Sequence, residues 1–90
     1  MTNILITGTN GFVGHNLYTL LEGIPSVNFI KGTRADLNLL NVNSVKEYLD
    51  KNNIEGIIHC AIEGGHRLKT YTPEITYNNI LMFENLIKFN

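Results

Sequence analysis

A glycine-rich segment, residues 7–14 with the sequence TGTNGFVG, constrains the fold of this chain more than any other feature. It follows an apolar run, residues 4–6, and precedes apolar residues at helical spacing. A short β-branched and aliphatic run is typical of a strand buried on both faces. The segment therefore predicts a buried strand, a tight glycine turn and a helix in direct succession.

Each glycine of the segment has a different expected role. Gly8 can take the backbone angles of a tight strand-to-helix turn. Gly11 has no side chain, so a pyrophosphate could approach the backbone there, and Gly14 lets the helix pack close to the strand. The amides and dipole at the helix start favour an anion. The segment predicts a nucleotide-binding turn, and a purely structural turn without ligand is the alternative.

The rest of the chain alternates helical patterns with short apolar runs. Ser44 and Glu47 form a capping-box pattern, and Thr72 before Pro73 is typical of an N-cap followed by the first helical residue. The expected elements are a helix from residue 12 that ends before Gly23, a strand over 27–30, a helix after 44, a strand over 57–62 and a helix from 72 to the chain end.

This order, β-α-β-α-β-α, predicts an α/β fold. Strands joined by helices pair in parallel through right-handed crossovers. We expect the N-terminal half of a Rossmann-like doubly wound parallel sheet, with strand order 3-2-1. The first strand would then keep one unpaired apolar edge, which is an aggregation or dimerisation hazard. On that ground, residues 1–90 are expected to be the N-terminal segment of a larger dinucleotide-binding domain, without the substrate domain.

Composition and charge exclude several classes of protein. Seven basic and eight acidic residues give a net charge of −1, which argues against a nucleic-acid partner. A single cysteine, Cys60, excludes an internal disulfide. The sequence has no apolar run of the roughly 20 residues that a membrane span needs, and its start does not resemble a signal peptide. We expect a soluble, cytoplasmic chain.

The spacing Gly-x-x-Gly-x-x-Gly, together with Phe12 inside it, resembles the extended short-chain dehydrogenase/reductase family of NAD(P)-dependent nucleotide-sugar epimerases and dehydratases. Asp36-Leu37 resembles the family's Asp-Leu pair, and His59-Cys60-Ala61 resembles the His-x-Ala stretch that ends a strand of the sheet. Asn79 resembles the asparagine of the helix that follows. The sequence looks most similar to the GDP-L-fucose synthase-like members, although Cys60 and Ile62 stand where the family usually has alanine.

The resemblance implies a nicotinamide dinucleotide cofactor and, in the full enzyme, a nucleotide-sugar substrate. The acid at Asp36 would face the adenine, and the stretch after the third strand would line the ribose. The cofactor-binding residues that we expect are Gly8, Asn10, Gly11, Phe12, Val13, Gly14, Arg34, Asp36, Leu37, Cys60, Ala61, Ile62 and Asn79.

The end of the second strand favours NADP over NAD. An NAD site places an acid there to hold the ribose 2′-hydroxyl, but no acid occurs before Asp36. Lys31 and Arg34 stand instead where a 2′-phosphate would lie, and an arginine can bind phosphate through two hydrogen bonds. The alternatives are two solvated surface cations and an NAD cofactor.

The sequence shows no catalytic residue and no metal site. His59 lacks partners at metal-ligand spacing, and Cys60 is interpreted as a small core residue. The family's proton-transferring Tyr-x-x-x-Lys does not occur, so the chain alone is expected to be inactive. Arg67 and Lys69 could approach a substrate phosphate or be ordinary surface charges. A non-catalytic NAD(P)-binding module, an inactive truncated gene product and a homodimer remain open.

Overall fold

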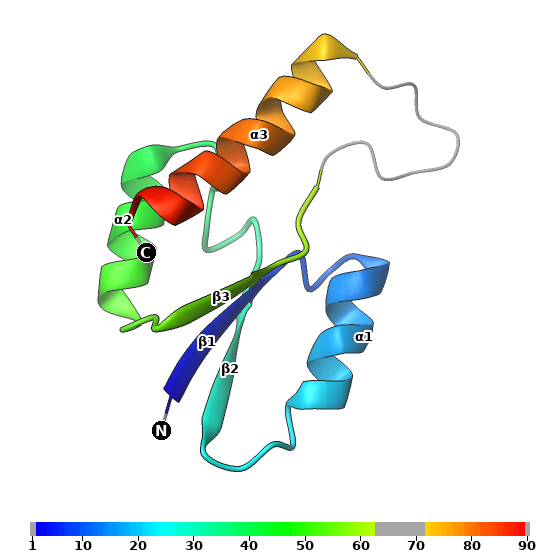
Figure 1. The fold of residues 1–90 in the computed structure, drawn as a ribbon, viewed down its shortest axis with the longest axis vertical. Coiled ribbons are helices and arrows are strands. Elements are labelled where there is room, and N and C mark those ends of the chain that lie inside the picture. The colour runs from blue at the N-terminus through cyan, green and yellow to red at the C-terminus, as the bar shows by residue number, and fades with distance from the viewer. Residues whose placement is uncertain (1, 63–71, 90) are drawn as a thin grey trace.

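The computed structural model describes residues 2–62 and 72–89, in which strands and helices alternate (Figure 1). The order β-α-β-α-β-α confirms the predicted fold class. The third strand is shorter than predicted, because it ends at His59. The elements are β1 (Thr2–Thr7), α1 (Phe12–Leu21), β2 (Val27–Gly32), α2 (Val42–Lys51), β3 (Gly56–His59) and α3 (Pro73–Lys88).

The sheet is parallel and has the order β2-β1-β3, so β1 lies at its centre. Leu5 pairs with Ile30 of β2 on one edge and with Ile57 of β3 on the other. The predicted order 3-2-1 is therefore wrong in the position of the third strand. The predicted unpaired apolar edge of the first strand is wrong for the same reason, because both edges of β1 are hydrogen-bonded to a neighbour.

Burial explains why β1 takes the centre. Leu5, Ile6 and Thr7 are each 0% exposed, and a strand that is apolar on both faces gains most from having neighbours on both sides. The segment after β2 contributes Leu37 and Leu39 to the same core cluster as Leu5. This segment directs the chain toward the face of the sheet where α2 packs, rather than along the outer edge of β2.

The strand order also decides which helix covers which face. Figure 1 shows α1 on one face of the sheet and α2 with α3 on the other. Crossovers between parallel strands are right-handed, so reversing the direction of travel across the sheet moves the connecting helix to the opposite face. The chain steps from β1 to β2 and then back across β1 to β3, which gives helices on both faces.

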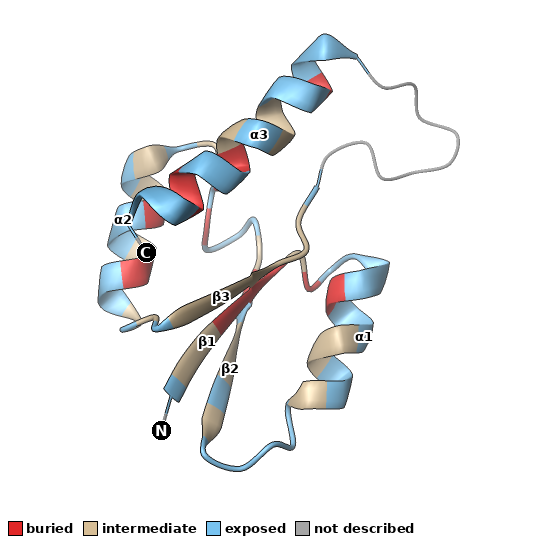
Figure 2. Ribbon diagram, in the orientation of Figure 1, coloured by how far each residue is buried: buried red, intermediate tan, exposed pale blue. Residues whose placement is uncertain are grey.

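The core lies between the sheet and the pair α2 and α3 (Figure 2). A buried polar link joins a helix to a loop, where Asn85 Nδ2 of α3 donates to the Leu39 carbonyl oxygen, 2.9 Å away. This bond satisfies both groups inside the core and fixes α3 against the segment before α2. The buried cluster consists of Leu5, Leu37, Leu39, Val45, Leu49, Met82 and Leu86.

The observed start of α3 agrees with the start predicted from the sequence, whereas the observed start of α2 does not. Thr72 caps α3 as predicted, since its hydroxyl accepts from the Ile75 N–H at 3.2 Å. The capping box predicted at Ser44 is wrong. Helix α2 begins at Val42, and the side chain of Asn41 accepts from the N–H groups of residues 43 and 44. Asparagine is as good an N-cap as serine, so local sequence did not distinguish the two starts.

Replacing Asn41 with alanine should lower the free energy of unfolding by about 1 kcal/mol, because two N–H groups at the start of α2 lose their acceptor. Urea unfolding followed by circular dichroism measures the change. Asn43→Ala is the matched control, since Asn43 is an exposed asparagine in the first turn of the same helix. Equal losses in the two variants would show that Asn41 is not the cap.

Candidate functional site

The turn after β1 needs glycine at position 8. Gly8 has a φ of +73°, in the left-handed region that glycine enters without strain. A Cβ atom on Gly8 would lie 2.6 Å from the backbone nitrogen of Ala61, so the turn packs directly against the chain that follows β3. The Gly8 N–H donates to the Gly32 carbonyl oxygen at the end of β2, 3.3 Å away. The turn therefore lies where the carboxyl ends of the three strands meet.

The other two glycines of the turn differ in what surrounds them. Gly14 is buried, and a Cβ atom there would collide with the Gly8 carbonyl oxygen and lie 2.7 Å from the Gly8 carbonyl carbon. This agrees with the expected close packing of the helix against the strand end. Within residues 2–62 and 72–89, a Cβ atom on Gly11 would meet only the Gly8 carbonyl oxygen, at 3.4 Å. The packing of these residues therefore leaves space beside Gly11.

In the part of the chain that the structure describes, the start of α1 lacks a side-chain cap. Its N-cap is Gly11, which has no side chain to accept from the first N–H groups, whereas the side chains of Asn41 and Thr72 cap α2 and α3. Thr9 is only 5% exposed, and its Oγ1 has no partner among the residues that the structure describes. N–H groups at a helix start bind anions, and an unpaired hydroxyl can donate to one. These groups fit the phosphates of a nucleotide.

The remaining loop residues of the predicted site surround the same turn. Asn10 is exposed, Phe12 is 84% exposed and Val13 is 64% exposed. Large apolar side chains are usually covered in a folded domain. Their exposure leaves an apolar rim beside the uncapped helix start.

The hydroxyl of Thr7 joins the end of β1 to the end of β3. Its Oγ1 accepts from the N–H groups of Cys60 and Ala61, at 3.0 and 3.2 Å. Its third partner is Nδ1 of His59, 2.7 Å away. The predicted ribose-wall residues Cys60 and Ala61 are thus held next to the glycine turn by one buried threonine. Ile62 follows them and is 60% exposed.

His59 closes β3 under the cover of α3. Its ring stacks on Phe83, with ring centroids 6.4 Å apart. Burial lowers the pKa of His59 below its ordinary value, because the charged ring would lose solvation. Asn79 lies one helical turn before Phe83 and therefore on the same side of α3. That side of α3 lies near the carboxyl end of β3, which is where the predicted site would need Asn79.

The two predicted cations, one near the end of β2 and one after it, have different surroundings. The ammonium group of Lys31 lies 4.6 Å from the centre of the Tyr18 ring on α1, a favourable cation–π distance. Arg34 is exposed and lies in a turn in which the Thr33 carbonyl oxygen accepts from the N–H groups of residues 36 and 37. This turn starts one residue after Gly32, whose carbonyl oxygen accepts a hydrogen bond from the Gly8 N–H. Arg34 therefore places a cation near the glycine-turn edge of the sheet.

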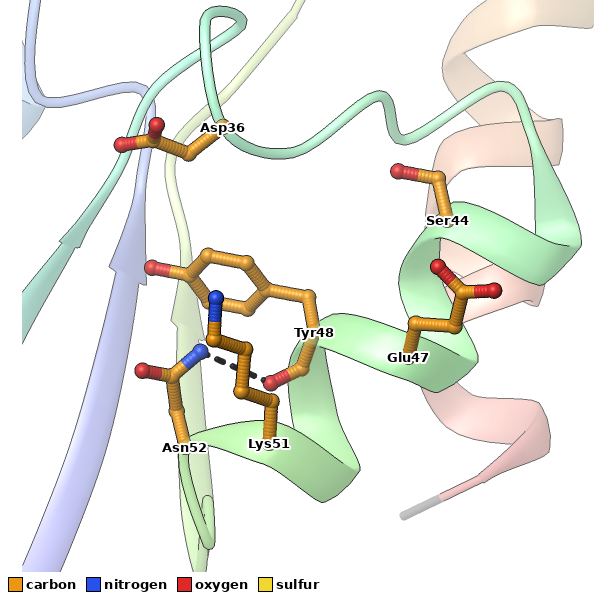
Figure 3. A pocket seen from close by; sticks show the side chains of 6 residues that line it. All are labelled: Asp36, Ser44, Glu47, Tyr48, Lys51 and Asn52. Carbon is orange, nitrogen blue, oxygen red and sulfur yellow. Dashed lines mark hydrogen bonds between the residues drawn. The ribbon is translucent and has the colours of Figure 1, made fainter.

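The Asp-Leu pair is divided between the core and the surface. Leu37 is 3% exposed and belongs to the core cluster, so its side chain supports the loop. Asp36 is exposed and borders a pocket of about 300 Å³ on the flank of α2 (Figure 3). Tyr48 lies in this pocket, and its pKa is raised mainly by burial and to a smaller extent by the Asp36 carboxylate. The lining residues are Asp36, Ser44, Glu47, Tyr48, Lys51 and Asn52.

Tyr48 also covers the outer edge of β2. Its hydroxyl donates to the Lys31 carbonyl oxygen, 3.2 Å away. The Gly32 carbonyl points toward β1, so the carbonyl of the preceding residue points the opposite way. The hydrogen bond therefore satisfies a carbonyl group that the sheet leaves unpaired.

Sequence reasoning missed two threonines of this site. Thr7 carries the bonds between β1 and β3, and Thr9 has the buried unpaired hydroxyl. The available signal was a polar residue on each side of Gly8 at the end of an otherwise apolar strand. The predicted contribution of Arg67 and Lys69 falls on residues 63–71, outside the described residues.

No helix in residues 2–62 and 72–89 is both long and apolar enough to cross a membrane. The same ranges contain no group of three or more histidine, cysteine, aspartate or glutamate side chains that could hold a metal ion.

Comparisons with known proteins agree with this geometry. GDP-L-fucose synthase of Escherichia coli (strain K12) is 28% identical over 86 residues, which are 93% of this chain and 27% of that protein. A dTDP-4-dehydrorhamnose reductase from Clostridium acetobutylicum matches in structure with a TM-score of 0.80 and 27% identity, over 94% of this chain and 30% of that chain. The chain thus spans less than a third of the length of either protein.

A third similarity concerns the fold alone. A GDP-L-fucose synthetase from Naegleria fowleri, solved with NADP bound, matches with a TM-score of 0.77 and 21% identity, over 98% of this chain and 26% of that chain. The sequence model of the NAD-dependent epimerase/dehydratase family matches residues 4–89, nearly the whole chain. The glycine turn, the parallel sheet and this match together show that the chain belongs to the NAD-dependent epimerase/dehydratase family.

Proposed function

We propose that this chain binds the dinucleotide of an NAD(P)-dependent enzyme that acts on nucleotide sugars. The observation that carries the proposal is the glycine turn, with an uncapped helix start and the unpaired Thr9 hydroxyl at the carboxyl edge of a parallel sheet. Ligands of open α/β sheets bind at that edge. Family membership supports the same reading.

The proposed contacts follow the geometry of the edge. The backbone at the start of α1 would hold the pyrophosphate, because N–H groups at a helix start bind anions and the described residues leave space beside Gly11. Cys60 and Ala61 would line a ribose, and the turn with Arg34 and Asp36 would meet the adenosine end. The full set remains Gly8, Asn10, Gly11, Phe12, Val13, Gly14, Arg34, Asp36, Leu37, Cys60, Ala61, Ile62 and Asn79.

The proposed cofactor is NADP rather than NAD. Arg34 is exposed at the glycine-turn edge, whereas Lys31 lies against an aromatic ring on α1. No acid stands between the end of β2 and Asp36 to bind a free 2′-hydroxyl. A guanidinium group suits a phosphate because it offers two parallel donors.

Calorimetric titration with NADP and with NAD tests the preference. The wild-type chain should bind NADP more tightly, and Arg34→Ala should reduce the NADP-to-NAD affinity ratio by about tenfold or more, since a hydrogen bond to a charged group contributes about 1.5–3 kcal/mol. Lys31→Ala is the matched control and should leave the ratio nearly unchanged. A ratio that Arg34→Ala does not alter would remove Arg34 from the site, and failure to bind either nucleotide would contradict the proposed function.

In a complete enzyme we propose that this chain is the N-terminal dinucleotide-binding segment. The nicotinamide would carry hydride to or from a sugar carbon, and this chain would bind and orient the cofactor. Its own sequence has no Tyr-x-x-x-Lys. We therefore expect the 90-residue chain to bind nucleotide without oxidising NADPH in the presence of a GDP-linked keto sugar, which the absorbance at 340 nm would reveal.

A further inference from the structure

Thr7 has three polar partners around one buried oxygen. The side chain is 0% exposed, and its Oγ1 lies 3.0 Å from the Cys60 nitrogen, 3.2 Å from the Ala61 nitrogen and 2.7 Å from Nδ1 of His59. These bonds connect the end of β1 to the last residue of β3 and the two that follow it. No water is needed to complete the set.

The hydrogen-bonding capacity of a hydroxyl fixes the direction of each bond. A threonine oxygen has two acceptor lone pairs and one hydrogen to donate. The two backbone N–H groups can only donate, so they occupy both lone pairs. The Thr7 hydrogen must therefore point at Nδ1 of His59, and Nδ1 must be unprotonated. The bonding pattern assigns His59 as the neutral ring with its proton on Nε2.

Protonation of His59 breaks this pattern. A proton on Nδ1 turns the ring nitrogen into a donor, so three donors compete for two lone pairs and the Thr7 hydrogen loses its acceptor. One partner must move away, because a buried donor without an acceptor is costly. Ala61 makes the longest of the three bonds, and its backbone is in contact with Gly8. A displacement of Ala61 therefore reaches the glycine turn directly.

We propose that His59 is a proton-sensitive positioning residue of the nucleotide site, which holds Ala61 against Gly8 when neutral and releases it when protonated. The inference rests on the proposed function, because it requires the glycine turn to bind a nucleotide. His59 acts through Thr7 and need not touch the ligand. Nucleotide affinity should then fall as His59 becomes charged.

The described groups packed against His59 carry no charge that could account for its lowered pKa, so burial is the cause. Among the described residues these groups are the Thr7 hydroxyl of β1 and the Phe83 ring of α3, and neither carries a charge. Glu84, next to Phe83, is exposed. Burial alone is the cause of the lowered pKa of His59. The associated stability is therefore present above the ordinary value of 6.5 and is lost as the pH falls through the lower pKa of the folded protein.

The first test is independent of nucleotide. Nitrogen-15 chemical shifts of the His59 ring should show an unprotonated Nδ1 at pH 7.5, and the Gly8 and Ala61 amide shifts should change with the same midpoint as the ring. Thr7→Ser keeps the hydroxyl and should preserve both results. Thr7→Val should remove the preference for the Nε2–H form. A proton on Nδ1 in the wild type, or amides that do not follow the ring, would overturn the proposal.

The second test measures nucleotide binding against pH. The probe is NAD, because NADP carries a 2′-phosphate that titrates in the same range. His59→Asn is the matched variant, since an asparagine oxygen can accept from Thr7 and does not titrate. Lowering the pH from 7.5 to below the midpoint that the His59 ring shifts give should weaken NAD binding by wild type about fivefold relative to His59→Asn, as expected for the loss of one hydrogen bond. His15 on α1 is present in both proteins, so its contribution cancels in this ratio.

The outcomes separate this inference from the proposed function. Equal pH profiles for the two proteins, or weakening in the variant alone, would contradict the role of His59 and leave nucleotide binding intact. Failure of both proteins to bind NAD or NADP at pH 7.5 would contradict the proposed function. In that case the chemical shifts of the ring and of the two amides still decide whether Thr7 and His59 position the turn.

Discussion

Replacing Gly14 with alanine is expected to lower the free energy of unfolding by about 1–3 kcal/mol, the usual cost of forcing an extra methyl group into a well-packed place. The new Cβ atom would collide with the Gly8 carbonyl oxygen and lie 3.1 Å from the Thr9 nitrogen. Both neighbours are backbone atoms, which cannot rotate aside as a side chain can. Either α1 must shift away from β1 or the glycine turn must open.

Urea unfolding monitored by circular dichroism measures this effect. The matched control is Gly23→Ala after α1, where a Cβ atom would meet nothing within 4 Å. That variant should be neutral or more stable by a few tenths of a kcal/mol, because alanine restricts the unfolded chain. Since the turn is also the proposed pyrophosphate site, Gly14→Ala should weaken nucleotide binding even at temperatures where it stays folded. Equal stability of the two variants would contradict the packing argument.

The second large effect is expected at Leu86, where alanine should cost about 2–5 kcal/mol. Leu86 is 2% exposed and packs in the cluster that joins α3 to α2 and to β1. Small domains have total stabilities of only about 5–15 kcal/mol, so this single change should leave a substantial unfolded population at room temperature.

Ile87 provides the comparison within the same helix. It is the next residue of α3 and is 52% exposed, so Ile87→Ala should change the free energy of unfolding by less than about 0.5 kcal/mol. Amide hydrogen exchange of α3 should accelerate strongly in Leu86→Ala and hardly at all in Ile87→Ala. Similar exchange in both variants would mean that α3 is not held by the core cluster.

Local patterns in the sequence were sufficient for the order of the elements and for the structural roles of two glycines. The glycine spacing predicted a strand, a turn and a helix, and Gly8 and Gly14 have the backbone and packing roles expected of them. The sequence predicted the N-cap at Thr72 because threonine, proline and an acidic residue in succession are typical of a helix start. Such features depend on residues within one turn of each other, so the sequence alone is informative.

Features that depend on distant residues needed the tertiary structure. The strand order differed from the prediction because Leu37 and Leu39 pack beside Leu5, which brings β3 to the free edge of β1. The start of α2 differed because two good caps, Asn41 and Ser44, compete, and Ser44 instead accepts from the Asn38 N–H. No local pattern distinguishes these alternatives.

The sequence by itself determined an alternating α/β chain with a glycine turn suited to a pyrophosphate. It also determined the family, through motifs that are each only a few residues long. Only the tertiary structure decided that β1 is central and that Thr7 connects it to His59 and Ala61 across more than 50 residues of sequence. The reason is physical: a turn is set by its own backbone angles, whereas the neighbours of a strand are chosen by which side chains from the whole chain best fill the core.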